Sequence, residues 1–235
     1  MKQKRWIAFL LILCVSLTMS FAVFDRTVHA ITQVELYSAK MVTDYTTTGT
    51  IKGYYSTGHI AIQNLSYQKN VTVHYTYDGT TWKDATASFV RTASDGYEVW
   101  SYQTEYKAYV PAHQYDYSCT FAVRYDVNGQ TYWDNNNGNN YFLRISSMNT
   151  EYPYVLAKSA VQLDDANRST DGTGMAGKLF LKNLGDPKTV KVRYTTNNWS
   201  TYTDASASYI KLYGNGIETW SFTISNLPSA ATVKF

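Results

Sequence analysis

Cysteine and histidine are scarce in this chain of 235 residues, which contains 2 Cys and 4 His. Beyond residue 30 it retains only Cys119, so that part can form no intrachain disulfide. Cys119 lies in an alternating apolar stretch and is expected to be a small core residue. His59, His74 and His113 show no metal-ligand or catalytic-triad spacing. We therefore expect no metal and no cofactor.

The chain also lacks an excess of either charge once its N-terminus is set aside. Residues 1–30 contain four of the 21 Lys and Arg residues but one of the 18 Asp and Glu residues, so the rest holds 17 of each sign. Binding to nucleic acid or to an anionic membrane surface calls for a basic stripe. A formally neutral chain predicts neither partner.

Long hydrophobic runs are missing except at the start of the chain. Basic residues precede the apolar run Ile7–Val15, and Val28-His29-Ala30 places small residues at the −3 and −1 positions of a signal-peptidase site. This pattern predicts a signal peptide over residues 1–30 and a mature chain that begins at Ile31. The alternative is an uncleaved anchor, but Ser and Thr interrupt the apolar segment, whereas a bilayer span needs about 20 apolar residues. We expect a protein that is secreted or held at the cell surface.

No stretch repeats at the 3.6-residue period of an amphipathic helix. The chain instead has 22 Tyr, with abundant Thr and Val, a bias that favours strands. Short alternating segments between polar turns predict an all-β fold of antiparallel β-sandwiches. The clearest predicted strands are Ile60–Ile62, Val71–Tyr75, Val99–Tyr102 and Phe121–Tyr125, and Asn128-Gly129 is a hairpin signal after the last of them.

An internal repeat with a period of about 120 residues indicates duplicated modules. The matching pairs are Val71–Thr76 with Val190–Thr195, Asp84–Phe89 with Asp204–Tyr209, and Glu98–Tyr102 with Glu218–Phe222. We place the modules at residues 31–148 and 155–235, joined by a linker at residues 149–154. Trp100 and Trp220 fall on the apolar phase of matching strands and are expected in the core.

The second copy is shorter than the first. Its last residue, Phe235, aligns with Phe121, so the final hairpin of the first copy has no counterpart. We expect the second sandwich to be incomplete, with an unpaired edge strand. We therefore expect residues 155–235 to be less stable than residues 33–146.

The most informative segment is Tyr132–Tyr141, in which two aromatic residues precede a cluster of Asn and Gly. A pyranose stacks its apolar face on an aromatic ring, and one amide offers a donor and an acceptor to its hydroxyls. The segment therefore predicts a sugar-binding loop. An ordinary turn is the alternative, because Asn and Gly tolerate positive φ. A calcium loop is disfavoured, since Asn139 and Ile145 stand where an EF-hand has Gly and Glu.

The segment Asn64–Val73, followed by Trp82, Tyr97–Trp100, Phe121–Tyr125 and Tyr132–Asn136, resembles the family 21 carbohydrate-binding modules. These include the starch-binding domains of fungal glucoamylases and the glycogen-targeting domains of protein phosphatase 1 regulatory subunits. The resemblance covers nearly all of the first repeat and most of the second. It implies tandem immunoglobulin-like β-sandwiches that bind α-1,4-linked glucan without cleaving it, and hence no enzyme.

The resemblance also implies which residues bind. One site is formed by Trp82, Tyr125, Trp133 and Asn135, in which rings stack on glucose and the amide binds hydroxyls. Trp82 follows a polar loop in which an indole is difficult to bury, in agreement with this placement. A second site uses Tyr67, with Asn64 as a further hydrogen-bonding residue.

The second repeat departs from this pattern. Trp199 aligns with Trp82 and is expected to stack on a sugar, but Asp186 takes the place of Tyr67. The hairpin that carries Trp133 has no counterpart either. We expect Trp199 alone to be a poor site and the first repeat to provide most of the binding.

The expected function is secreted, non-catalytic binding of starch or glycogen, with an amylolytic enzyme as the expected protein partner. Glycoside hydrolysis needs two facing carboxylates, whereas the adjacent acids Asp164-Asp165 lie in a polar stretch and are expected to be solvated. A phosphatase scaffold is disfavoured, because nothing between Ile31 and Ile60 resembles the basic-Val-x-Phe docking segment of those relatives. The other alternative is a surface adhesin or structural sandwich that binds another polysaccharide or a protein.

Overall fold

The computed structural model describes residues 32–109, 116–146 and 151–235, except for the side chains of Asp116 and Ser146. The predicted signal peptide, the predicted mature start at Ile31 and His113 lie outside the described residues. All elements of the described part are strands, and their pairings are antiparallel, which confirms the all-β fold class. Within the same part, no helix has the length and hydrophobicity that crossing a membrane requires.

The first eleven strands follow one another along residues 34–156. They are β1 (Val34–Tyr45), β2 (Ile51–Ile62), β3 (Lys69–Thr76), β4 (Lys83–Thr86), β5 (Ser88–Thr92), β6 (Glu98–Gln103), β7 (Lys107–Ala108), β8 (Asp116–Val127), β9 (Gln130–Asp134), β10 (Tyr141–Ser146) and β11 (Tyr154–Leu156).

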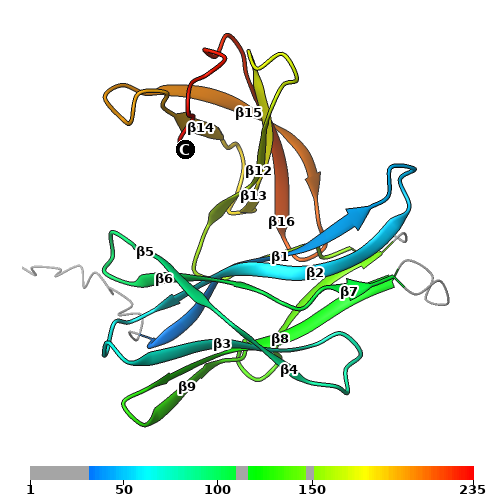
Figure 1. The fold of residues 1–235 in the computed structure, drawn as a ribbon, viewed down its shortest axis with the longest axis vertical. Helices are drawn as coiled ribbons and strands as arrows, with labels where there is room; N and C mark the ends of the chain where they lie inside the picture. Colours follow the sequence, from blue (N-terminus) through cyan, green and yellow to red (C-terminus); the bar gives the residue numbers. More distant parts are fainter. Residues whose placement is uncertain (1–31, 110–115, 147–150) are drawn as a thin grey trace, which may run out of the picture. The chain divides into compact units, whose positions relative to one another are not determined.

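These strands form two layers around one core. One sheet has the order β11-β1-β2-β6-β5, with β7 on β2, and the other has the order β10-β8-β3-β4, with β9 on β8. In Figure 1 the pair β1–β2, in blue and cyan, lies over the layer of β3, β8 and β9. Leu36 and Ile60 of the first sheet and Val73, Cys119 and Phe121 of the second are fully buried in one cluster. Alternate residues of both sheets thus meet in the core of a β-sandwich.

The local sequence signals agree with these elements. The four predicted strands fall within β2, β3, β6 and β8. Asn128 and Gly129, with φ of 52° and 72°, form the turn between β8 and β9. Positive φ at both central residues is the geometry that Asn-Gly favours in a two-residue hairpin. The predicted hairpin is confirmed.

The second repeat contains the remaining five strands. They are β12 (Val161–Arg168), β13 (Met175–Lys182), β14 (Lys191–Tyr194), β15 (Thr203–Leu212) and β16 (Ile217–Ile224). They form one sheet in the order β12-β13-β16-β15-β14. In the first repeat Ala87 separates β4 from β5, whereas the equivalent residues here run on as the single strand β15.

Matching irregularities support the internal repeat. Gly58 and Gly177 occupy equivalent places, each beside a β-bulge in the neighbouring strand. A Cβ at Gly58 would lie 2.2 Å from the backbone oxygen of Ser38, and one at Gly177 would lie 2.3 Å from that of Asp165. Neither position therefore accepts a side chain without a backbone shift.

The boundary between the repeats is less simple than the sequence indicated. β11 begins at the predicted linker, yet it pairs with β1 and so extends the first sheet, with Ser38 opposite Leu156 and Lys40 opposite Tyr154. The division into modules at residues 31–148 and 155–235 stays a prediction.

The expectation that Asp164 is solvated is wrong. Its side chain is 12% exposed, and its carboxylate accepts hydrogen bonds from Lys40 Nζ at 2.6 Å and from the Tyr154 hydroxyl at 2.9 Å. Burial raises the pKa of the Tyr154 hydroxyl, and the neighbouring Asp164 raises it further. The carboxylate thus has a structural role, because it is partnered on both sides.

Among the described residues, β14 has a strand partner on one side only, which is β15. A single bridge joins Thr195, directly after β14, to Lys234. In the first repeat the equivalent Thr76 pairs with Thr120 of β8. This register agrees with the alignment of Phe235 with Phe121.

Candidate binding site

The outer surface of β3, β8 and β9 carries the main group of candidate residues. In β3 the buried residues Val71, Val73 and Tyr75 alternate with outward residues, of which His74 is one. Arg124 of β8 lies opposite Trp133 of β9. Because side chains alternate between the faces of a strand, His74, Arg124 and Trp133 share the solvent face of this sheet.

A turn before β4 positions Trp82. The Asp78 carboxylate accepts hydrogen bonds from the backbone N–H groups of Thr80, at 2.8 Å, and Thr81, at 2.6 Å. The bond from Thr81, and then that from Thr80, holds the pKa of this carboxyl well below its usual range. Gly79 supplies the positive φ of 75° that the turn needs. The charged Asp78 therefore fixes the loop that carries Trp82.

His74 links the two predicted tryptophans. Its imidazole is stacked on Trp82, with centroids 4.8 Å apart and an interplanar angle of 12°. The same ring meets Trp133 edge-on at 6.0 Å and 78°. Trp82 is 38% exposed and Trp133 is 48% exposed. The structure thus joins both predicted residues in one accessible aromatic surface.

Charged groups hold this surface in place. His74 Nδ1 lies 2.6 Å from Asp84 Oδ1, and Arg124 Nη2 lies 3.2 Å from Asp84 Oδ2. A carboxylate only accepts hydrogen bonds, so Nδ1 of His74 carries a proton that it donates to Asp84. The Arg124 guanidinium also lies 5.8 Å from the ring centroid of Trp133. These contacts restrict His74 and Trp133 before any ligand arrives.

The Asn-rich loop after Trp133 is a turn with polar edges. Asn136, Asn137 and Asn140 have φ between 52° and 58°, the left-handed conformation that Asn tolerates. The side-chain oxygen of Asn135 accepts a hydrogen bond from the backbone N–H of Gly138 at 3.0 Å. The backbone of this loop is therefore an ordinary turn, as the alternative interpretation predicted. The side chain of Asn135 is exposed, so its NH2 group is available to donate hydrogen bonds to a ligand.

The prediction that Tyr125 stacks on a sugar needs correction. Its ring is fully buried, and its hydroxyl donates a hydrogen bond to the backbone oxygen of Gln63 at 2.8 Å. Tyr125 shares the inward phase of β8 with Phe121 and Val123, so it faces the core rather than the solvent. Burial raises the pKa of its hydroxyl. Tyr125 is a core residue beneath the aromatic surface.

The residues of the second predicted site lie near a different cluster. Tyr67 is 97% exposed. The side-chain oxygen of Asn64 accepts a hydrogen bond from Lys69 Nζ at 2.6 Å, and the same Nζ lies 2.9 Å from the Glu98 carboxylate. Glu98 also accepts a hydrogen bond from Nε1 of Trp100 at 3.0 Å. Lys69 and Glu98 thus hold Asn64 in place, and Trp100, expected in the core, is half-buried and packs against it.

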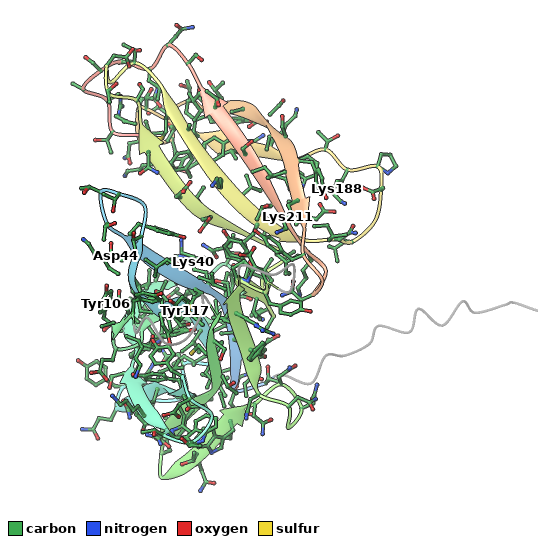
Figure 2. The ribbon with its side chains drawn as sticks, turned by 90° about the vertical axis from the view of Figure 1, so that its right-hand side faces the viewer. Lys40, Asp44, Tyr106, Tyr117, Lys188 and Lys211 are labelled. Carbon is green, nitrogen blue, oxygen red and sulfur yellow. The ribbon has the colours of Figure 1, made fainter. Side chains whose placement is uncertain are left out.

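The second repeat reproduces this cluster. Lys188, labelled in Figure 2, lies 2.8 Å from the Glu218 carboxylate and donates to the side-chain oxygen of Asn183 at 2.9 Å. Glu218 accepts a hydrogen bond from Nε1 of Trp220 at 2.8 Å. The hydrogen bond to Glu218 raises the pKa of Lys188. Trp220 is half-buried, like its counterpart.

Trp199 does not occupy the place of Trp82. In the first repeat Tyr75 pairs with Lys83, directly after Trp82, and in the second Tyr194 pairs with Thr203. The residue before Thr203 is Tyr202. Trp199 lies earlier in the loop, exposed and with a positive φ of 69°. The structural equivalent of Trp82 is therefore Tyr202, which the sequence alignment missed.

His74, Asp84 and Arg124 were also missed as site residues. The alternation of apolar and polar residues could have identified two of them. His74 and Arg124 are polar residues on the outward phase of the predicted strands Val71–Tyr75 and Phe121–Tyr125. Their convergence follows from the order β8-β3-β4, which depends on pairing between distant strands. In the part of the chain that the structure describes, no group of three His, Cys, Asp or Glu residues is placed to hold a metal ion.

Comparison with known proteins supplies independent information. Residues 32–144 and 155–234 match a family described as carbohydrate/starch-binding module, family 21. Protein phosphatase 1 regulatory subunit 3B of Danio rerio is 34% identical over 96 residues, which cover 39% of this chain and 31% of that protein. The chain thus spans about a third of the length of the curated relatives that it matches.

Two solved structures are also similar. The starch binding domain of Rhizopus oryzae glucoamylase, in complex with beta-cyclodextrin and maltoheptaose, is 29% identical, with 47% of this chain and 91% of that chain covered and a TM-score of 0.33. The carbohydrate binding module of the muscle glycogen-targeting subunit of protein phosphatase-1 is 28% identical, with coverages of 46% and 74% and a TM-score of 0.30.

Proposed function

The chain belongs to the family 21 carbohydrate/starch-binding modules, and from this premise we propose that it binds α-1,4-glucan, as starch or glycogen, through the outer face of β3, β8 and β9. The observation that carries the proposal is the contact of His74 with both Trp82 and Trp133. Two exposed indoles held in one surface provide adjacent platforms for the apolar faces of successive glucose residues.

Weak contacts suit a polymeric ligand. Each stacked ring contributes about 1 kcal/mol beyond the burial of its area. The amide donors of Asn135, in the loop that follows Trp133, add hydrogen bonds to hydroxyl groups. A glucan chain that also reaches Tyr67 and Asn64 gains from the high effective concentration of its neighbouring segments. Binding is therefore expected to be much tighter to starch than to a free sugar.

Export and partners belong to the same proposal. The basic and apolar segments of residues 1–30, with Val28-His29-Ala30, support secretion or display at the cell surface. N-terminal sequencing of protein recovered outside the cell tests this, with Ile31 expected as the first residue and Met1 as the contrary result. An amylolytic enzyme is the protein partner that fits a secreted starch-binding protein.

The experiment for glucan binding is affinity electrophoresis of the chain from Ile31 to Phe235, in native gels with and without soluble starch or glycogen. Trp82→Ala and Trp133→Ala remove one platform each. Tyr45→Ala is the matched control, because Tyr45 is an exposed aromatic residue at the end of β1. Thermal melting of each variant is measured in parallel.

Retardation of the parent and of Tyr45→Ala, with clearly weaker retardation of both Trp variants at unchanged melting temperature, is the expected result. If the parent is not retarded by starch or glycogen, the proposal is wrong. A surface adhesin or structural sandwich that binds another polysaccharide or a protein then becomes the better explanation.

A further inference from the structure

The second repeat contains an arrangement of three side chains that matches the first. Arg193 of β14 pairs with Asp204 of β15, as His74 of β3 pairs with Asp84 of β4. Tyr202 lies two residues before Asp204, at the same spacing as Trp82 before Asp84. In both repeats an exposed ring is therefore followed by an aspartate that faces a basic side chain on the neighbouring strand.

The contacts within this group are equivalent as well. The Arg193 guanidinium lies 3.8 Å from the ring centroid of Tyr202, where it covers one face of the ring. Tyr202 is nevertheless 57% exposed, so much of the rest of its ring is open to solvent. In the first repeat His74 covers one face of Trp82 in the same manner.

Asp204 holds Arg193 in this position. Arg193 Nε donates to Asp204 Oδ1 at 2.7 Å, and Nη2 donates to Oδ2 at 3.0 Å. This two-pronged hydrogen bond lowers the pKa of Asp204 and raises that of Arg193. Both groups stay charged near neutral pH, and each neutralises the other. The group therefore offers an anion no unpaired positive charge, and a neutral ligand with an apolar face suits it better.

We propose that the second repeat has a carbohydrate-binding site of its own. In this site Tyr202 stacks on a glucose residue of the glucan, while Arg193 and Asp204 hold the ring of Tyr202 in place. The inference rests on the proposed function of the chain. The site has one supported platform where the first repeat has two, because the described residues hold no counterpart of Trp133 beside Arg193. Its contribution is therefore to add a weak second attachment to a long glucan.

The ligand for the test is starch, a long glucan, compared with the short glucan maltoheptaose. Tyr202→Ala removes the ring and Tyr202→Phe retains it. Trp199→Ala tests the neighbouring exposed aromatic residue of the same loop. All variants are made in the chain from Ile31 to Phe235, and Tyr45→Ala again serves as the control.

Tyr202→Ala is expected to weaken retention by starch about fivefold, the ratio that corresponds to one stacking contact of about 1 kcal/mol. Affinity for maltoheptaose at the first site stays unchanged, Tyr202→Phe retains the parent behaviour, and melting temperatures agree. In a Trp82→Ala/Trp133→Ala chain, residual retention by starch disappears when Tyr202→Ala is added.

Three results overturn the inference. If Tyr202→Ala binds starch like the parent, the second repeat has no site at this ring, while the proposed function stands. If Trp199→Ala weakens retention and Tyr202→Ala does not, the stacking residue is Trp199 and the assignment is wrong. If the parent binds neither starch nor glycogen, both proposals fail together.

Discussion

The imidazole of His74 lies parallel to the indole of Trp82, with ring centroids 4.8 Å apart. The two residues come from β3 and from the loop before β4, and Asp84 fixes the imidazole by accepting a hydrogen bond of 2.6 Å from Nδ1. A histidine thus supports one tryptophan and touches the other, Trp133, at its edge. The aromatic surface depends on a residue that is not itself a large hydrophobe.

The first prediction concerns this support. His74→Ala removes the ring between the two indoles, so Trp82 loses the contact that orients it and maltoheptaose affinity falls by about 1 kcal/mol, or fivefold. His74→Phe restores stacking without the hydrogen bond to Asp84 and recovers most of the affinity. Isothermal titration calorimetry with maltoheptaose measures both variants. Equal affinities of parent and His74→Ala would show that Trp82 needs no support.

The second prediction tests whether Tyr125 is a core residue rather than a ligand-binding residue. Tyr125→Phe keeps the buried ring but removes the hydrogen bond from its hydroxyl to the backbone oxygen of Gln63, which retains the hydrogen bond from the Leu65 N–H. The loss of one hydrogen bond costs about 0.5–1.5 kcal/mol, so the urea midpoint falls while glucan affinity is unchanged. Reduced affinity at unchanged stability contradicts the assignment of Tyr125 to the core.

The third prediction is a loss of stability at alkaline pH. Burial raises the pKa of Tyr54 from 10.0 to about 12 and that of Cys119 from 9.0 to about 12. The unfolded chain therefore loses these protons at lower pH than the folded chain. Their contribution to stability is full below about pH 9 and is lost as the pH rises towards 12.

Urea unfolding between neutral pH and about pH 12 tests this expectation, and the midpoint should begin to fall near pH 9. Cys119→Ala is the control. It removes the part of the decrease in the urea midpoint that begins near pH 9, because the thiol of the unfolded chain ionises at a lower pH than tyrosine does. A midpoint that stays constant to the end of this range is inconsistent with buried, protonated Tyr54 and Cys119.

The fourth prediction compares equivalent strands of the two repeats. β3 has strand partners on both sides, β4 and β8, whereas β14 pairs only with β15 in the described part of the chain. Amides in Lys191–Tyr194 are therefore expected to exchange with deuterium faster than those in Lys69–Thr76. Hydrogen exchange followed by mass spectrometry provides the comparison. Similar protection of both segments refutes lower stability of the second repeat.

Alternation along single strands was enough to predict much of this fold. The apolar phase of Val71–Tyr75 and of Phe121–Tyr125 identified buried residues and the outward faces, and Asn128-Gly129 identified the hairpin. The same alternation places Tyr125 in the core, because Tyr125 shares the inward phase of Phe121 and Val123. The family resemblance, in contrast, implies that the ring of Tyr125 is accessible to a sugar.

Loop residues were harder to place. Trp199 and Tyr202 both lie between matched segments of the second repeat, and an alignment pairs the two Trp residues because they are identical. The register of Tyr194 with Thr203 shows that Tyr202 takes the place of Trp82. Asp164 was likewise misplaced, because its partner Lys40 is distant in sequence.

Composition, alternation and repetition along the chain thus specify an antiparallel β fold with aromatic and amide groups suited to a sugar, since these properties depend on near neighbours. The pairing of distant strands specifies the rest. It brings His74 between Trp82 and Trp133, turns Tyr125 into the core and sets Tyr202 over Arg193. These contacts arise from strand order and register, which hydrogen bonds between remote segments determine.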